Sequence, residues 1–286
     1  MRTEQEMMDA VLGFARRDER IRVVGMEGSR TNIHAPRDEF QDYDISFLVT
    51  DMASFQQSDN WLDAFGPRII LQKPEAMELF APELGNWFSY LMLFRDGAKM
   101  DLTLVPLEEL PLYLSSDKLL RILLDKDGRV LCKPEPTDED YWIKRPTPAC
   151  VDDCCNEFWF TSTYVAKGLC RDELLFAAYH MEAIVRPQLL LMLSWRIGLE
   201  KGFTFSVGKH YKYIRPYLTQ PQWELLLRTY RMDGVAHCWQ ALFAAHSLFR
   251  QASKEVARLV GHPYPDYDEQ VSGYIAGLYR RFGQTG

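Results

Sequence analysis

Two neighbouring stretches decide how this chain folds: VVGMEGSRTN (23–32) and DYDISFLV (42–49). They predict a buried strand, a tight Gly-Ser turn, an irregular loop, and a second strand that opens with two acids. Because successive side chains of a strand alternate between its faces, Asp42 and Asp44 point the same way. Two adjacent carboxylates repel each other unless a cation lies between them, and Mg²⁺ takes oxygen ligands. The turn supplies N–H groups and a hydroxyl that suit phosphate oxygens, so the sequence predicts a metal-dependent nucleoside triphosphate site.

A third acid lies in KMDLTLV (99–105), where Asp101 shares a strand face with Thr103 and Val105. If this strand pairs beside that of Asp42 and Asp44, three carboxylates converge and hold one or two Mg²⁺ ions. We therefore expect these three acids to be the catalytic and metal-binding residues, with the identity of the general base left open. The alternative is that they are solvated acids at the edge of loops and turns.

Within the turn, Gly28 and Ser29 are expected to bind the triphosphate through backbone and hydroxyl groups, and Arg30 through its charge. The arginine has an alternative role, because a loop arginine is as often a surface ion-pair partner.

The spacing from the Gly-Ser pair to Asp42-x-Asp44 resembles the nucleotidyltransferase superfamily that includes polymerase beta. The surrounding residues are similar to the aminoglycoside 6-adenylyltransferases, which inactivate streptomycin. Further matches are ELGNWF (83–88), KMDLTL (99–104), YWIKRPT (141–147), DCCNEFW (153–159) and YPDYD (264–268). This resemblance implies transfer of AMP from ATP, with Mg²⁺, to the 6-hydroxyl of streptomycin, and it implies substrate contacts at Glu83 and Trp87.

A charged stripe follows in the second half of the chain, at steps of four, three, four, three and four residues: Asp153, Glu157, Phe160, Tyr164, Lys167 and Arg171. This spacing places the six on one helix face if Gly168 does not break the helix, with Asp153 about 21 Å from Lys167 at ~1.5 Å per residue. We expect Asp153 and Glu157 to bind the cationic drug, because carboxylates bind guanidinium groups in a bidentate fork. Tyr164, Lys167 and Arg171 are expected to contact the nucleotide. The alternative is an ordinary solvated helix face.

The patterning predicts an α+β fold: an N-terminal nucleotidyltransferase domain with a mixed β-sheet and flanking helices (1–135), a proline-rich linker (136–149), and a C-terminal helical bundle domain for the substrate (150–286). Strands are expected at 21–26, 45–49, 68–72, 87–94 and 99–105, with an edge strand at 128–132. Helices are expected at 3–17, 106–114, 117–124, 152–168, 171–201, 220–230 and 235–260.

Bulk properties limit the partners. Of the net charge of −7, residues 1–140 carry −11 and residues 141–286 carry +4. An acidic N-terminal half is a poor surface for nucleic acid and a good one for steering a polycation, although it also serves solubility alone. The N-terminus lacks a signal-peptide pattern, no apolar run is long enough to span a bilayer, and six cysteines suit a reducing compartment. We expect a cytoplasmic protein without nucleic-acid or membrane partners; its oligomeric state stays open, a monomer included.

Other chemistries lack support. The segment from Gly202 to Lys209 has the wrong spacing for a P-loop, and Cys150, Cys154 and Cys155 lack a second ligand pair for zinc. Three functional hypotheses therefore stand: adenylylation of streptomycin, nucleotidyl transfer to another acceptor (another aminoglycoside, a lincosamide or a protein hydroxyl), and a non-catalytic relative that binds nucleotide or a partner. Retention of all three acids argues against the last.

Overall fold

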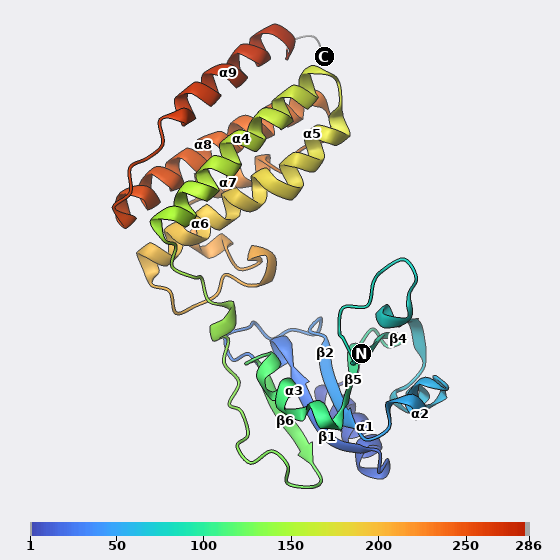
Figure 1. Cartoon of the computed structure of the whole chain (residues 1–286). Helices are drawn as coiled ribbons and strands as arrows, with labels where there is room; N and C mark the ends of the chain where they lie inside the picture. The colour runs from blue at the N-terminus through green and yellow to red at the C-terminus, as the bar shows by residue number, and fades with distance from the viewer. Residues whose placement is uncertain (1, 284–286) are drawn as a thin grey trace. The chain divides into compact units, whose positions relative to one another are not determined.

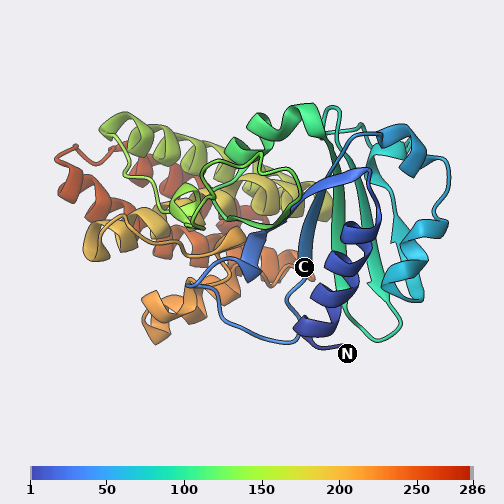
Figure 2. The same cartoon turned by 90° about the horizontal axis from the view of Figure 1, so that it is seen from below.

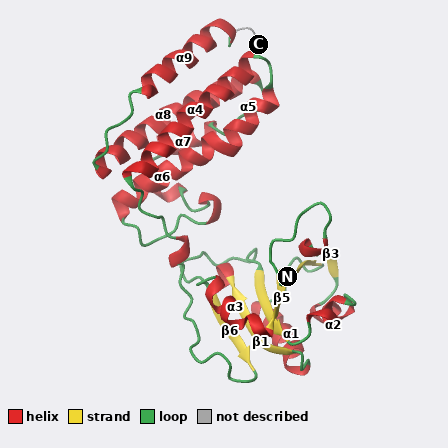
Figure 3. Ribbon diagram, viewed as in Figure 1, coloured by secondary structure: helices red, strands yellow, loops and turns green. Residues whose placement is uncertain are grey.

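The computed structural model describes residues 2–283 and divides the chain into two compact units, Met1–Asp140 and Tyr141–Gly286. The strands of the described chain all belong to the first unit, and the second unit is helical (Figure 3). The division falls in the acidic segment that precedes Pro146 and Pro148. The predicted α+β class, with a mixed sheet followed by a helical bundle, is confirmed.

A six-stranded sheet in the order β3-β4-β5-β2-β1-β6 forms the centre of the first unit (Figure 1). Only β2 and β5 pair in parallel; the other neighbours are antiparallel. This parallel pair brings together two strands that are far apart in the chain, and it decides which side chains meet at the site. The strands are β1 (Ile21–Glu27), β2 (Tyr43–Val49), β3 (Arg68–Gln72), β4 (Phe88–Phe94), β5 (Lys99–Pro106) and β6 (Leu120–Asp125).

One face of the sheet is covered by α1 (Glu4–Arg17), which Figure 2 shows in dark blue beside the strands, and by α2 (Met52–Gln56). Thr3 and Glu6 form a capping box that starts α1, and Met7 and Val11 of its apolar stripe are fully buried against the sheet. Alternate residues of β2 and β5 face this core, so the residues between them face the other side.

The other face is only partly covered. Helix α3 (Leu110–Ser116) packs Leu110 and Tyr113 over the half of this face that contains Val23, Leu48 and Val105. At the opposite ends of the same three strands the outward residues are polar, and they are not packed into this cluster. The candidate site residues lie at this uncovered half.

Two predicted elements of the first unit are wrong. A helix was expected at 117–124, but its apolar residues also fit a strand, and Leu120–Asp125 pair with the edge of β1 as β6. Residues 128–132 do not form the expected edge strand. The helix expected at 171–201 is present as one continuous helical run from Leu174 to Lys201, in which a π-helical turn (Met181–Val185) separates α5 (Leu174–His180) from α6 (Arg186–Lys201).

The second unit packs its helices around Trp159, Leu193, Trp239 and Phe249, which are buried. Besides α5 and α6 it contains α4 (Pro148–Cys170), α7 (Gln220–Arg228), α8 (Val235–Val260) and α9 (Tyr267–Phe282). The sequence patterning did not predict α9. None of the helices in the described chain has both the length and the apolar content required to cross a bilayer, and the six cysteines are free thiols.

Candidate active site

Three carboxylates stand in one row across the uncovered half of the sheet. The register pairs Glu27 of β1 with Asp44 of β2, and Asp44 with Asp101 of β5. Paired residues of neighbouring strands project from the same face, so Asp44 and Asp101 lie side by side, as expected from the sequence. Glu27 was not predicted from the sequence, since its place in the row follows from strand register, which local patterning does not contain.

Lys99 connects Asp42, the remaining predicted ligand, to this row. Asp42 directly precedes β2, and the Lys99 ammonium donates to Asp42 Oδ2 at 2.7 Å and to Asp101 Oδ2 at 2.8 Å. Burial acts to lower the pKa of Lys99, but the hydrogen bonds with Asp101 and Asp42 outweigh it and raise the pKa above its ordinary value. Lys99 is therefore a permanent cation between two of the three predicted ligands.

Gly28 has to be glycine for two reasons. Its φ of +72° lies in the left-handed region, and a Cβ at this position would stand 2.3 Å from Asp44 Oδ2. The turn is anchored by the Gly28 N–H, which donates to the Leu119 carbonyl at 3.1 Å, just ahead of β6. The first residue of the Gly-Ser motif thus makes room for the carboxylate of Asp44.

Ser29 and Arg30 follow in a single 3₁₀ turn (Gly28–Arg30). Within residues 2–283 the Ser29 hydroxyl makes no hydrogen bond, so it is available to a ligand. Arg30 is 7% exposed, and its guanidinium donates to the carbonyls of Gln41 and Asp42 at 2.8 and 2.9 Å and to Glu4 at 2.9 Å. This arrangement gives Arg30 the role of holding Asp42 in place, instead of the direct phosphate contact expected from the sequence.

Tyr113 closes the row at its other end. Its hydroxyl passes over Gly25, where a Cβ would overlap it, and donates to Glu27 Oε1. Burial raises the pKa of Glu27 to about 7, although hydrogen bonds from Tyr113 and Ser46 act in the opposite direction. The Glu27 side chain is thus held by α3 from above and by β2 from the side.

Trp87 supports Tyr113. The two rings meet edge-on with centroids 6.0 Å apart, and the Trp87 indole donates to Glu109 at 2.6 Å. Trp87 thus has a packing role, and its expected contact with the substrate stays a prediction. Glu83 is exposed in the segment before β4.

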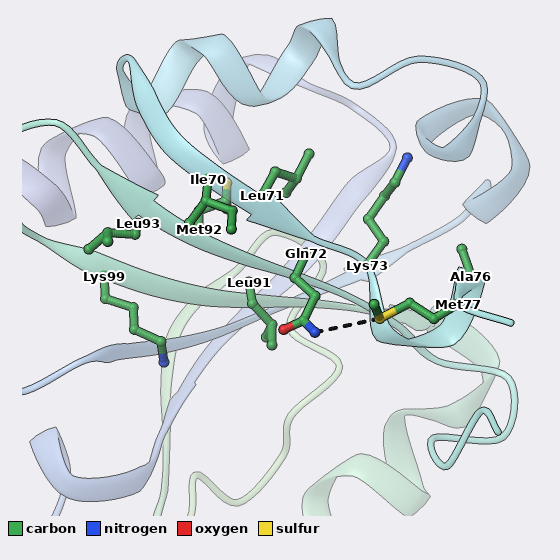
Figure 4. A pocket seen from close by; sticks show the side chains of 10 residues that line it. All are labelled: Ile70, Leu71, Gln72, Lys73, Ala76, Met77, Leu91, Met92, Leu93 and Lys99. Atoms are coloured by element: carbon green, nitrogen blue, oxygen red, sulfur yellow. Dashed lines mark hydrogen bonds between the residues drawn. The ribbon is translucent and has the colours of Figure 1, made fainter. Parts of the chain in front are cut away.

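A recess of about 630 Å³ opens on the same side of the sheet, next to Asp101. Its walls are mostly apolar, and Figure 4 shows Lys99 and Met77 at opposite ends of it. Leu91, which lines the recess, pairs directly with Asp101 in the sheet. The carboxylates therefore stand beside a recess within the first unit that can receive part of a ligand.

Five residues of the charged stripe of the second unit lie on helix α4, and the sixth, Arg171, is the C-cap residue of this helix. Helix α4 continues through Gly168 to Cys170. A Cβ at position 168 would meet Phe176 and Ala177 of α5 at 2.9 and 3.3 Å, so the glycine gives α5 room to pack against α4. All six residues of the stripe are exposed, Phe160 by 56% and Tyr164 by 37%. Phe160 and Tyr164 make an edge-on contact at 5.5 Å in the middle of the stripe, between its acids and its bases.

The donor chemistry of Asp42, Asp44 and Asp101 fits a hard divalent cation. The ligand candidates are oxygen atoms, a lysine ammonium already neutralises two of them, and Asp101 Oδ1 is buried without a hydrogen-bond partner among the described residues. However, no group of three acidic, histidine or cysteine side chains in residues 2–283 is arranged to hold a metal ion. The carboxylates of Asp42 and Asp101 are joined through Lys99 instead.

The mixed sheet, the Gly-Ser turn beside it and the paired Asp44 and Asp101 have the organisation expected of a nucleotidyltransferase. A sequence model of the streptomycin adenylyltransferase family matches residues 1–278, and the chain belongs to this family. The resemblance found in the sequence is thereby confirmed.

Named relatives agree over nearly the full length. The aminoglycoside 6-adenylyltransferase of Bacillus subtilis (strain 168) is 55% identical over 98% of this chain and 99% of its own. Those of Campylobacter jejuni and Staphylococcus aureus are 54% and 45% identical, over 99% and 98% of this chain and 98% and 99% of their own. A solved structure of an aminoglycoside 6-adenyltransferase from Bacillus subtilis is 51% identical, covers 98% of this chain and 99% of that chain, and has a TM-score of 0.48.

Proposed function

We propose that this protein transfers AMP from ATP to the 6-hydroxyl of streptomycin, releasing pyrophosphate, with Mg²⁺ as its metal ion and the cytoplasm as its site of action. The observation that carries the proposal is the sheet register that pairs Asp44 with Asp101 beside the glycine-lined turn. Family membership and the names of the relatives support the donor and the acceptor. Other acceptors are outcomes of the test described below.

In this proposal Asp42, Asp44 and Asp101 would hold a metal ion, which would neutralise charge on the phosphates. The N–H groups of the turn and the Ser29 hydroxyl bind phosphate oxygens. The drug hydroxyl attacks the α-phosphorus, the bond to pyrophosphate breaks, and the hydroxyl proton passes to one of the carboxylates. Arg30 contributes by fixing the backbone of Asp42.

The stripe of α4 supplies the remaining contacts. Asp153 and Glu157 bind the guanidinium groups of streptomycin, because an exposed carboxylate pair one helical turn apart accepts planar N–H donors in bidentate fashion. Tyr164, Lys167 and Arg171 lie further along the same exposed face and contact the nucleotide. We retain Glu83 and Trp87 as drug contacts on the strength of the resemblance alone.

The test is a drug panel. The protein is incubated with ATP, MgCl₂ and each of several aminoglycosides, and we measure the pyrophosphate released and the mass added to the drug. We expect one adenylyl group per streptomycin, and Asp44→Asn to reduce the rate by at least about 100-fold. Transfer of the adenylyl group to a different aminoglycoside would change the assigned acceptor but leave the proposed reaction in place. Intact ATP and unmodified drugs across the whole panel would refute the proposal.

A second assay addresses the stripe. Glu157→Gln is expected to raise the KM for streptomycin by about ten-fold and to leave the KM for ATP unchanged, since one charge-assisted contact is lost. Asp152→Asn is the control, because Asp152 is also exposed on α4, next to Asp153, but lies outside the stripe. Equal KM values for the two variants would show that the stripe does not bind the drug.

A further inference from the structure

The cation between Asp42 and Asp101 belongs to the protein itself. The Lys99 ammonium lies 2.7 Å from one carboxylate and 2.8 Å from the other, so it pairs with two of the three acids that would hold a metal ion. We propose that Lys99 is an internal counter-cation that holds these two carboxylates together before metal binds, and that the divalent ion has to displace it. This inference rests on the metal site of the proposed function.

The geometry explains why Lys99 competes with a metal ion. Residues 99 and 101 are two apart on β5 and project from the same face, while Asp42 reaches the pair from the chain segment that enters β2. One ammonium therefore satisfies two acids at once, and these acids otherwise repel each other across neighbouring strands. Asp101 Oδ1, by contrast, is buried and unpartnered within the described part of the chain. Lys99 thus uses one oxygen of Asp101 and leaves the other available to a ligand.

Two consequences follow for a metal ion. A positive charge a few Å from a partly solvated ion weakens the binding of that ion by about ten-fold, and breaking both ammonium–carboxylate contacts adds to this cost. Without Lys99 the site therefore binds a divalent cation more tightly, but the metal-free protein loses the charge that keeps the two acids together. Lys99 in this way weakens metal binding and stabilises the metal-free site.

Lys73 provides a matched control. Its ammonium pairs with Asp59 at 2.9 Å, and its side chain is 37% exposed, as is that of Lys99. Both lysines line the recess of Figure 4, but Lys73 contacts neither Asp42 nor Asp101. Lys73→Met therefore removes the same charge from the wall of the same recess without removing a contact to Asp42 or Asp101.

The experiment uses the full chain and MnCl₂ alone, with binding followed by calorimetry and by the electron paramagnetic resonance signal of free Mn²⁺. Lys99→Met is expected to bind Mn²⁺ about ten-fold more tightly than the wild type, and Lys73→Met and Lys99→Arg to bind it within about two-fold of the wild type. In EDTA, Lys99→Met is expected to unfold at a Tm lower by about 2–4 °C, since one ammonium no longer bridges two acids. Added Mn²⁺ then raises its Tm more than that of the wild type.

Two results overturn the inference: equal or weaker Mn²⁺ binding by Lys99→Met, or a Tm in EDTA equal to that of the wild type. Asp101→Asn separates this failure from failure of the proposed function. If the wild type and Lys99→Met both bind Mn²⁺ and Asp101→Asn abolishes that binding, the metal site stands and only the role of Lys99 is in question. If no variant shows binding that depends on Asp101, the metal site and the proposed function fail together with this inference.

Discussion

Replacing Gly28 by alanine tests whether the Gly-Ser turn exists to make room for Asp44. The new Cβ would lie 2.3 Å from Asp44 Oδ2 and 3.1 Å from its Cγ. Ordinary contacts begin near 3.4 Å, so the carboxylate oxygen has to retreat by about 1 Å, and a misplacement of that size costs on the order of 100-fold in rate. The backbone adds a separate cost, because alanine in the left-handed region loses about 1–2 kcal/mol of stability.

Gly128→Ala isolates the backbone cost. Gly128 has a φ of +66°, close to the +72° of Gly28, and lies in the same unit, and a Cβ added to it would meet nothing within 4 Å. Both variants should therefore lose about 1–2 kcal/mol of unfolding free energy. Only Gly28→Ala should also lose activity, since only its Cβ meets a carboxylate of the site.

Two measurements decide the matter: urea unfolding of both variants, and kcat for pyrophosphate release with ATP and streptomycin. We expect the unfolding free energies to fall by similar amounts and kcat to fall about 100-fold in Gly28→Ala alone. If kcat of Gly28→Ala stays within about three-fold of Gly128→Ala, the position of Asp44 does not limit the reaction, and the assignment of Asp44 to the reacting site is refuted.

Three further predictions concern stability. Burial raises the pKa of Glu27 from 4.5 to about 7, so between these two pH values the folded protein keeps a proton that the unfolded chain releases. The free energy of unfolding therefore falls by at most about 3 kcal/mol as the pH rises from 4.5 to about 7. Glu27→Gln should abolish this fall, as urea midpoints at about pH 5 and about pH 8 would show. Tyr113→Phe removes a hydrogen bond that lowers this pKa, so the fall should extend to higher pH in the same assay. Asp268→Ala leaves Arg250 without its bidentate partner and should lower the free energy of unfolding, measured in urea, by about 3 kcal/mol. The control variant Asp266→Ala should have the unfolding free energy of the wild type.

Local sequence patterns predicted the parts of the fold that depend on contacts between residues close together in the chain. Alternation along β2 and β5 placed Asp42, Asp44 and Asp101 on one face, and steps of three and four placed the stripe on α4. Residues 117–124 show the limit of such patterns, because their closely spaced leucines fit a helix and a strand equally well. Their strand conformation is decided by the open edge of β1, which is a tertiary contact.

The same limit applies to individual site residues. The position of Arg30 directly after the Gly-Ser pair predicts a phosphate ligand, yet its partners are Glu4 in α1 and the carbonyls at the end of the loop. Glu27 and Lys99 had no motif to identify them. Each acquires its role from a residue on another strand, Asp44 for Glu27 and Asp42 for Lys99.

Strand register is therefore the property on which the chemistry of this site depends. On β5, Lys99 and Asp101 alternate with Met100 and Leu102, which are fully buried on the opposite face. A shift of one residue in the β2–β5 pairing would bury both charges and expose two apolar side chains, so the hydrophobic core excludes it. The apolar residues of β5 consequently do more than stabilise the first unit. By fixing the register against α1 and α2, they determine that a lysine and an aspartate of β5 meet the acids of β2 on the half of the sheet that α3 leaves uncovered.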